Sequence, residues 1–326
     1  MKVFIHVFLF LCTLAVLLPL VNLLAVSLTD PAYAHLMDGL DLWPKKFSLF
    51  TYEVLLKNRL IAGGLLNSVF ITAAGTLLNL LLTTMAAYVI ARNDFYGKGL
   101  VVFFLIVILV FEPGLIPEYL LVKELGLINT YAVLILYKGI NVYYLFIMMR
   151  YFQDVPNELL EAARIDGAGH LRIYAQVMLP LSKAGIATLG LFYGVFHWNE
   201  YFRSMIYISD QRKWPLQVVL RQFVIRQDNA TILGGYEHLF GGTIVDFDAL
   251  QAGTIIIAIV PLLLLYPMIL KYYANQSDGG QLLRVLPGAR RFGQGEVRHH
   301  GRGRSRRDRL HLQRGVRHHL DLAEEG

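Results

Sequence analysis

The chain has 326 residues, of which 56% are hydrophobic and only 17% are charged, with a mean hydropathy of +0.49. Soluble globular proteins carry about 25% charged residues, so this composition excludes an ordinary water-soluble domain. A single cysteine, Cys12, excludes a disulfide framework and a cysteine-based metal site. The sequence contains no P-loop, zinc-protease or hydrolase nucleophile motif. We therefore expect neither enzymatic activity nor a metal site on this chain.

The positive charge is concentrated near the end of the sequence. Residues 275–326 hold 11 Arg, no Lys and 6 acidic residues, whereas residues 1–274 hold 19 basic and 18 acidic residues. Two interpretations of residues 274–326 are open: an out-of-frame translation of a GC-rich gene, which we favour, and an Arg-rich arm that binds anionic lipid or nucleic acid. Low hydrophobicity and high charge predict disorder in both cases. We expect no nucleic-acid partner.

Six apolar runs are each long enough to cross a membrane as a helix, which takes about 20 residues. They cover residues 3–28, 64–91, 98–121, 128–150, 184–208 and 250–273. We therefore expect an all-α polytopic membrane protein with six transmembrane helices. The first run has a basic start and is followed by Ala32-Tyr33-Ala34, as in a secretory signal. It is longer than the core of such a signal, which spans about 7–15 residues, so we expect it to be retained as a helix.

These runs divide the chain into three parts. They are a first helix with an outer loop over residues 1–63, a five-helix core over residues 64–273, and the polar tail over residues 274–326. With six spans, both termini share one side with the loops 92–97 and 151–183. Lys and Arg are biased toward that side only weakly, so charge alone does not orient the chain.

The loop over residues 154–180 is the most informative segment. Asp154 can cap a helix, Pro156 suits a first helical turn, and Gly167 is a typical left-handed terminator. The pattern predicts a short amphipathic helix, a turn at the glycine, and a second helix directly after it.

This loop resembles the EAA signature of ATP-binding-cassette (ABC) importer permeases, whose pattern is E-A-A-x3-G-x9-I-x-L-P. The matching residues are Glu161, Ala162, Ala163, Gly167, Val177, Leu179 and Pro180, with Val177 replacing the usual Ile and Asp166 preceding the glycine, as is typical. Residues 1–272 are similar to permeases of carbohydrate importers of the maltose-type group, most of all its aldouronate and multiple-sugar branch. Further segments that carry the resemblance are residues 115–117, 125–130, 194–202 and 214–217.

The resemblance implies a type I ABC importer permease fold and a division of labour between several chains. The coupling helix and its flanking turns would comprise Glu161, Ala162, Ala163, Asp166, Gly167, Leu179 and Pro180, and a separate cytoplasmic ATPase would dock there. ATP and Mg²⁺ would bind that partner, and this chain would hold no cofactor. A second homologous permease, an extracytoplasmic solute-binding lipoprotein and a sugar would complete the system. The resemblance also implies a bacterial cytoplasmic membrane protein with both termini in the cytoplasm.

Several polar residues fall inside the apolar runs, where such residues usually face the bundle interior or water. Aromatic rings stack on sugar faces and amides bind hydroxyl groups, so the candidates for a sugar path are Glu112, Asn141, Trp198, Asn199 and Tyr201. An alternative is that His197, Glu200 and Arg203, which are spaced by three, form an internal polar cluster on one helix face. In a further variant Arg203 reaches the outer interface. Glu112 and Lys138 are a candidate pair across the third and fourth runs.

The leading hypothesis is therefore the membrane subunit of a carbohydrate importer. The alternatives are an ABC permease for another solute such as a peptide or a polyamine, a proton-coupled carrier, and a membrane-embedded enzyme. A carrier is expected to show internal repeats and a proton relay within the membrane, and neither is evident in the sequence. No catalytic constellation supports an enzyme. The sequence does not specify the sugar.

Overall fold

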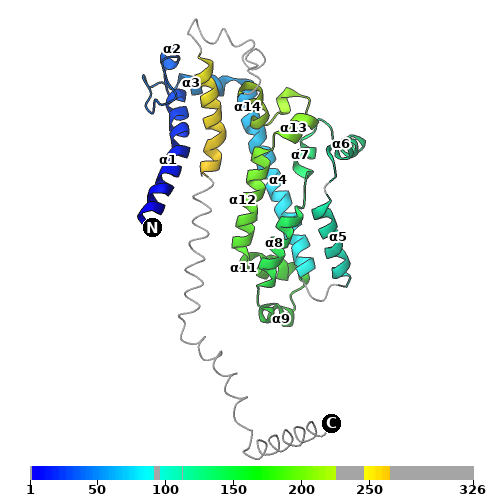
Figure 1. Ribbon diagram of the computed structural model, residues 1–326. Coiled ribbons are helices and arrows are strands. Elements are labelled where there is room, and N and C mark those ends of the chain that lie inside the picture. The colour runs from blue at the N-terminus through cyan, green and yellow to red at the C-terminus, as the bar shows by residue number, and fades with distance from the viewer. Residues whose placement is uncertain (1, 92–95, 112, 225–245, 265–326) are drawn as a thin grey trace, which may run out of the picture. The chain divides into compact units, whose positions relative to one another are not determined.

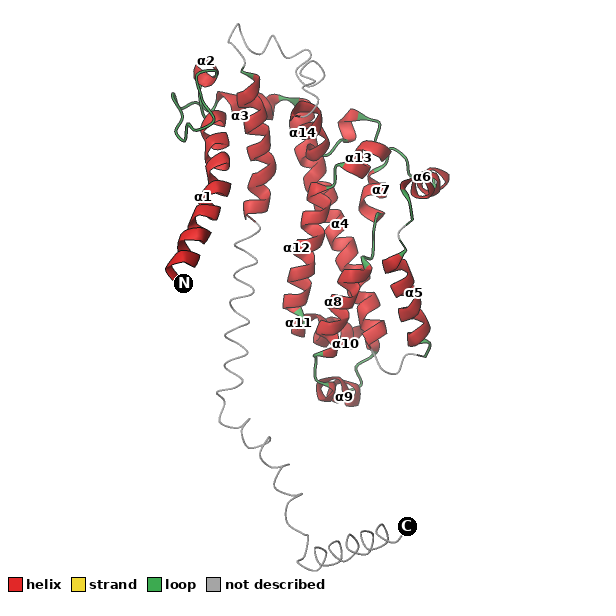
Figure 2. Cartoon of the chain, viewed as in Figure 1, coloured by secondary structure: helices red, strands yellow, loops and turns green. Residues whose placement is uncertain are grey.

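The computed structural model describes residues 2–91, 96–111, 113–224 and 246–264. These residues form helices and no β-sheet (Figure 2), apart from an isolated antiparallel bridge between Thr29 and Phe47. The expected all-α class is confirmed. The chain divides into the units Met1–Leu270 and Lys271–Gly326. The second unit, and with it the polar tail discussed above, lies outside the described residues.

The described helices fall into two groups along the chain. The first group is α1 (Lys2–Ser27), α2 (Pro31–Ala34), α3 (Phe50–Lys57), α4 (Arg59–Ala91), α5 (Lys98–Val110), α6 (Leu115–Glu124), α7 (Tyr131–Leu136) and α8 (Val142–Gln153). The second group is α9 (Asn157–Ile165), α10 (His170–Ile173), the π-helix η1 (Tyr174–Met178), α11 (Leu179–Leu181), α12 (Lys183–Asn199), α13 (Phe202–Tyr207), the 3₁₀-helix η2 (Gln211–Lys213) and α14 (Leu216–Val224). A further helix spans Phe247–Leu264.

Length and composition allow three of the described helices to cross a membrane: Phe4–Ser27, Arg59–Ala91 and Phe247–Leu264. Two bent pairs raise this to as many as five spans: α5 with α6, bent by 114°, and His170–Leu181 with α12, bent by 82°. The expectation of continuous helices over residues 98–121, 128–150 and 184–208 is therefore wrong in detail, because each of these runs is interrupted.

Each interruption has a local cause. Pro113 and Gly114 separate α5 from α6, since proline cannot donate the hydrogen bond that would continue a helix. Between α7 and α8, Lys138 adopts a positive φ of 48°, a conformation that no α-helix contains. After α12, the Glu200 carboxylate accepts a hydrogen bond from the backbone N–H of Arg203 in the first turn of α13, at 3.0 Å.

The helix α4 is the central element, and α8, α12 and α14 pack along it (Figure 1). Helices in lipid associate through close packing and small residues rather than through the hydrophobic effect. Gly75 of α4 illustrates this, because a Cβ atom there would lie 2.5 Å from Nε2 of His197 on α12. Gly185 of α12 likewise approaches the ring of Tyr151, at 2.6 Å from an added Cβ atom.

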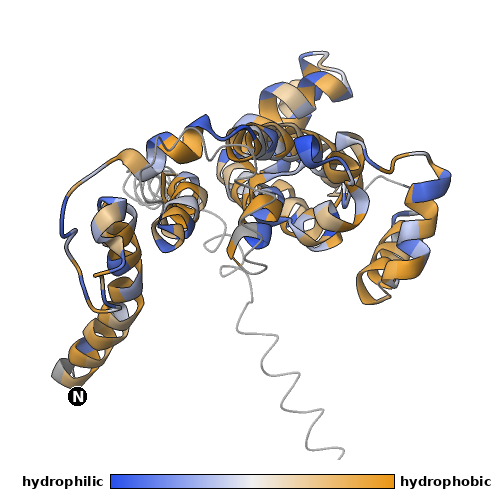
Figure 3. Ribbon diagram, turned by 90° about the horizontal axis from the view of Figure 1, so that it is seen from above, coloured by the Kyte–Doolittle hydropathy of each residue, from blue (hydrophilic) through white to orange (hydrophobic). Residues whose placement is uncertain are grey.

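The outward helix faces are also apolar. Figure 3 shows hydrophobic residues around the circumference of the helices, and side chains such as Phe4, Leu77 and Phe103 are 74%, 71% and 59% exposed. Large exposed apolar surfaces are unfavourable in water and mark contact with a membrane or another protein. The helix α1 is the extreme case, since none of the residues in its most apolar stretch is buried within the chain.

Candidate functional site

The loop between α8 and α12 begins differently from the sequence prediction. Asp154 is the C-cap of α8 and does not cap the next helix, because its backbone N–H still bonds to the carbonyl of Arg150 at 3.1 Å. Pro156 occupies the N-cap position of α9, one residue before the first helical position. The two helices are separated by Val155, which is buried. The predicted helix is present, but it begins at Asn157.

The helix α9 presents most of its surface to the outside. It lies at one end of the bundle (Figure 1), and none of its residues is fully buried. The apolar Ile165 is 86% exposed and Leu159 is 45% exposed. Ala162 and Glu161 are exposed as well, whereas Ala163 is half-buried against the core. An exposed amphipathic helix with small and apolar residues on its free face is suited to contact with another protein.

The end of α9 is fixed by a hydrogen-bonded turn. Gly167 has a φ of +78°, and its N–H bonds to the carbonyl of Arg164 at 3.0 Å. The N–H of Ala168 bonds to the carbonyl of Ala163 at 2.9 Å. These two bonds form a Schellman motif, with Asp166 at the C-cap and glycine in the left-handed position. The predicted left-handed turn at Gly167 is confirmed.

The second half of the loop ties α9 to the centre of the protein. The hydroxyl groups of Tyr174 and of Thr84 on α4 share a hydrogen bond of 2.8 Å, and both residues are buried. Leu179 is half-buried against the core, whereas Pro180 is exposed. Because proline lacks an N–H, the α-helical ladder loses one bond there, and the preceding residues Tyr174–Met178 form a π-helix.

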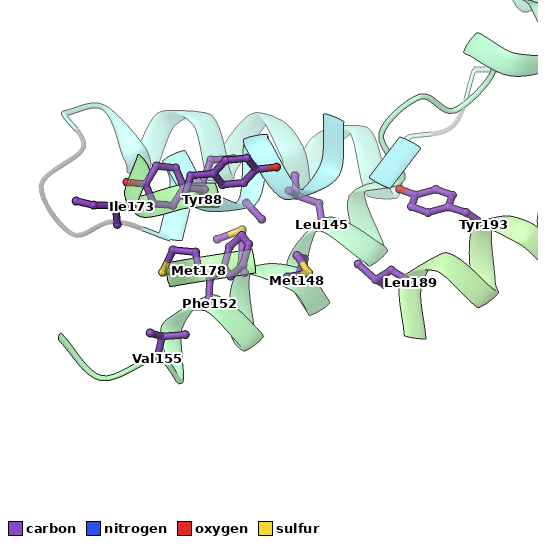
Figure 4. Close-up of a cluster of buried hydrophobic side chains, with 13 residues drawn as sticks. Tyr88, Leu145, Met148, Phe152, Val155, Ile173, Met178, Leu189 and Tyr193 are labelled. Carbon is purple, nitrogen blue, oxygen red and sulfur yellow. The ribbon is translucent and has the colours of Figure 1, made fainter. Parts of the chain in front are cut away.

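A buried cluster connects the loop with α4, α8 and α12. We call it the α4–α8–α12 core, and its buried members are Ala87, Tyr88, Ile90, Leu145, Met148, Met149, Phe152, Val155, Ile173, Tyr174, Met178, Leu189 and Tyr193. Figure 4 shows Ile173 and Met178 from the loop beside Tyr88 of α4 and Phe152 of α8. Close-packed side chains transmit displacement because their interiors are scarcely compressible. A force on the loop therefore reaches the long helices.

A cavity of about 450 Å³ lies between α9 and this core. Tyr88 and Phe152 form its apolar wall, and Gln153, Glu161 and Arg164 supply polar groups at its rim. Beside this cavity, α9 still packs against the core through Ala163. One side of the helix therefore contacts the bundle, and the exposed side is open to contact with another protein.

The residues considered for a sugar path do not form one group. Asn141 caps α8, with its side-chain oxygen accepting from the N–H of Tyr143 at 3.0 Å. Trp198 is 5% exposed and donates its indole N–H to the carbonyl of Ala258 at 3.0 Å. Asn199 and Tyr201 are exposed where α12 ends. Glu112 lies outside the described residues, as does its suggested pairing with Lys138.

The structure contradicts the alternative in which His197, Glu200 and Arg203 form one polar cluster on a helix face. His197 is 4% exposed, and its Nε2 lies 3.2 Å from the Asn79 side-chain nitrogen on α4. Glu200 instead binds Arg203, with 3.2 Å between Oε2 and Nη1. The cause is the end of α12 at Asn199, which turns Glu200 and Arg203 away from the face that carries His197.

Sequence reasoning missed the second carboxylate near Arg203. Glu118 of α6 lies 3.5 Å from the Arg203 Nε atom and accepts a hydrogen bond from the Tyr207 hydroxyl at 2.8 Å. The Arg203 guanidinium also stacks on the Tyr137 ring, 3.9 Å from its centroid. The partners are far apart in sequence, so no local pattern could have identified this ion pair.

Comparison with known proteins adds a family and a set of relatives. Residues 60–276 match the sequence profile of a family described as "Binding-protein-dependent transport system inner membrane component". A polygalacturonan/rhamnogalacturonan transport system permease of Bacillus subtilis is 36% identical, over 87% of this chain and 97% of its own length. An arabinooligosaccharide transport system permease of Halalkalibacterium halodurans is 32% identical, over 66% of this chain and 72% of its own.

A solved structure has a similar fold. It belongs to a bacterial ABC transporter involved in the import of the acidic polysaccharide alginate. The match has a TM-score of 0.77 and 24% sequence identity, and it covers 83% of this chain and 96% of the solved chain. At this level of sequence identity, the match shows that the two chains share a fold and nothing further.

Proposed function

Because this chain belongs to the family of binding-protein-dependent transport system inner membrane components, we propose that it is the permease subunit that carries oligosaccharides in a bacterial ABC importer. The observation that carries the proposal is the similarity to permeases whose names specify saccharides, of which one is 36% identical and aligns along 97% of its length. The likeness of the loop at residues 154–180 to the EAA signature supports an ATP-driven mechanism.

In this proposal, α9 is the element that receives force from a separate ATPase, which binds ATP and Mg²⁺. Its exposed Glu161 and Ala162 would lie in the docking contact, and the Schellman turn at Gly167 would hold the helix at a fixed angle. Tyr174 and the α4–α8–α12 core would pass the movement to α4, α8 and α12. This chain would then act as a mechanical element, and hydrolysis would occur on the partner.

The remaining partners follow from the same assignment. A solute-binding lipoprotein would deliver the sugar on the extracytoplasmic side, at the end of the bundle opposite α9, where α3 and α14 lie (Figure 1). A second, homologous permease would complete the pathway, and the exposed apolar faces described above give it surface to contact. Both termini and α9 would lie in the cytoplasm.

Among the candidate path residues, Asn199 and Tyr201 have the exposure that contact with a sugar requires. Trp198 and Asn141 serve the packing of the chain itself, through the hydrogen bonds to Ala258 and within α8. We therefore assign the sugar path first to Asn199 and Tyr201.

An uptake experiment tests the proposal. The gene would be deleted in frame in the source bacterium, and uptake of labelled arabinotriose, trigalacturonate, a tripeptide and spermidine would be measured with and without complementation. We expect the deletion to abolish uptake of at least one saccharide and to leave the tripeptide and spermidine unaffected. Normal saccharide uptake with a loss of tripeptide or spermidine uptake would contradict the proposal.

A further inference from the structure

A second cavity lies at the end of the bundle opposite α9, beside the break between α12 and α13. It has a volume of about 310 Å³, which is at the small end of the range for sites of small organic ligands, roughly 300–1,000 Å³. Its walls come from the turn before α13, from α14 and from the helix Phe247–Leu264. The lining residues are Tyr201, Gln217, Leu220, Arg221, Val224 and Ile255.

The charge in this cavity is a half-buried guanidinium that has no carboxylate partner among the described residues. Arg221 lies over the Tyr201 ring, 5.1 Å from its centroid, and its Nη1 atom lies 3.2 Å from the Met205 sulfur. A thioether is a weak acceptor, so the contacts among the described residues leave most of the donors of this guanidinium available. A partly desolvated cation without a counter-ion favours the binding of an anion.

Two neighbouring arginines show the usual arrangement by contrast. Arg203 is neutralised by Glu200 and Glu118, at 3.2 and 3.5 Å. Arg212 binds Asp210 at 3.2 Å, and this hydrogen bond lowers the pKa of the Asp210 carboxyl group. The negative charge of Glu200 is therefore already engaged and does not cancel the charge of Arg221.

We propose that this cavity binds a carboxylate-bearing sugar unit, a uronate, on its way through the importer. The Arg221 fork would hold the carboxylate through two parallel hydrogen bonds, a geometry that guanidinium provides and ammonium does not. The Tyr201 ring, which is 41% exposed, would stack on the apolar face of the sugar ring. The Gln217 amide would bind a hydroxyl group, since it offers both donors and an acceptor. A neutral sugar would offer no anionic group to the guanidinium.

This inference rests on the proposed function and adds a substrate class to it. A hydrogen bond to a charged group changes an affinity on the order of ten- to a hundredfold. The test compares uptake of trigalacturonate with uptake of α-1,4-linked galactotriose, its neutral counterpart, by the complete transporter in proteoliposomes. The binding protein is the same for every variant, so a change in the uptake ratio arises in the permease.

We expect Arg221→Gln to lower the ratio of acidic to neutral uptake roughly tenfold or more. Arg212→Gln is the matched control, because it removes a cation that is already paired outside the cavity, and it should leave the ratio unchanged. Arg221→Lys keeps the charge but loses the planar fork, so it should lower the ratio by a smaller factor. If Arg221→Gln does not accumulate in the membrane, the uptake ratio of Arg221→Lys tests the inference in its place.

Binding of trigalacturonate to the transporter in nanodiscs without binding protein, followed by saturation-transfer NMR, gives a second readout that should fall in Arg221→Gln. An unchanged uptake ratio in both Arg221 variants would overturn the inference. An equal loss of acidic and neutral uptake would also overturn it and would indicate a structural or lipid-binding role. Uptake of galactotriose without trigalacturonate would refute the uronate site but leave the sugar importer standing. Uptake of neither saccharide, nor of any other, would instead count against the proposed function.

Discussion

The turn that ends α9 provides the sharpest test of how this chain is coupled to an ATPase. Gly167 has a φ of +78°, and an added Cβ atom would meet nothing within 4 Å. A substitution there is therefore strained by backbone conformation and not by contact with neighbours. A non-glycine residue in a left-handed conformation costs about 1–2 kcal/mol, and a β-branched residue costs more.

The chain contains a matched control two residues away. Gly169 has a φ of −70° and a ψ of 168° at the N-cap of α10. Threonine, which has the shape of valine, suits both this extended conformation and an N-cap, and the space around the residue is also open. Gly167→Val should therefore disrupt the turn, whereas Gly169→Thr should be neutral. If the penalty falls on the docked state, about 1–2 kcal/mol corresponds to an approximately five- to thirtyfold weaker ATPase association.

The assay measures co-purification of the ATPase and sugar uptake in the same cells, after the amount of permease in the membrane has been equalised. We expect Gly167→Val to lower both quantities together and Gly169→Thr to lower neither. Equal behaviour of the two variants would show that the left-handed turn has no role in coupling. A fall in uptake with normal ATPase association would place the defect elsewhere in the cycle.

Three further predictions concern the loop, the packing of α4 and the topology. Glu161→Lys reverses a charge in the proposed docking contact, so it should reduce ATPase co-purification without changing the amount of permease in the membrane; an unaltered yield of ATPase would exclude this residue from the contact. Gly75→Ala introduces a methyl group 2.5 Å from the His197 ring and should destabilise the purified protein by about 1–3 kcal/mol. Gly63→Ala is the control, because the space around Gly63 is open, and it should not destabilise the protein. Thermal unfolding in detergent compares the stability of the two variants. The topology is tested in a variant whose single cysteine is replaced by serine. A new cysteine at Asn157 should react with an impermeant maleimide from the cytoplasmic side, and one at Gln211 should react from the outer side. Outer labelling at Asn157 would refute the assignment of α9 to the ATPase.

The features that could be predicted from the sequence are those that a few neighbouring residues determine. The turn at Gly167 follows from one residue type with an unusual conformational range, and the structure has it at the predicted position. The start of α9 was less well defined, because Asp154 and Pro156 both fit an N-terminus and the choice depends on where α8 ends. Such boundaries are commonly uncertain by one or two residues.

Interruptions within apolar runs could not be placed in the same way. Polar residues do lie near these breaks, among them Lys138, Glu200 and Arg203, but polar residues also occur inside continuous membrane helices, so they do not show where a helix ends. In the structure, the segments beside these breaks also contact distant partners, since Arg203 stacks on Tyr137 and Asn79 binds His197. Contacts across more than a hundred residues, as in this last pair, leave no periodic trace in a single sequence.

ATP-driven accumulation by the purified system is the most direct test of the central claim. The chain, its partner permease, the ATPase and the binding protein would be reconstituted in proteoliposomes with ATP inside and a labelled oligosaccharide outside. We predict accumulation above the outside concentration with ATP, and none when a proton gradient replaces ATP. Accumulation driven by the proton gradient alone would contradict the proposal and indicate a secondary carrier.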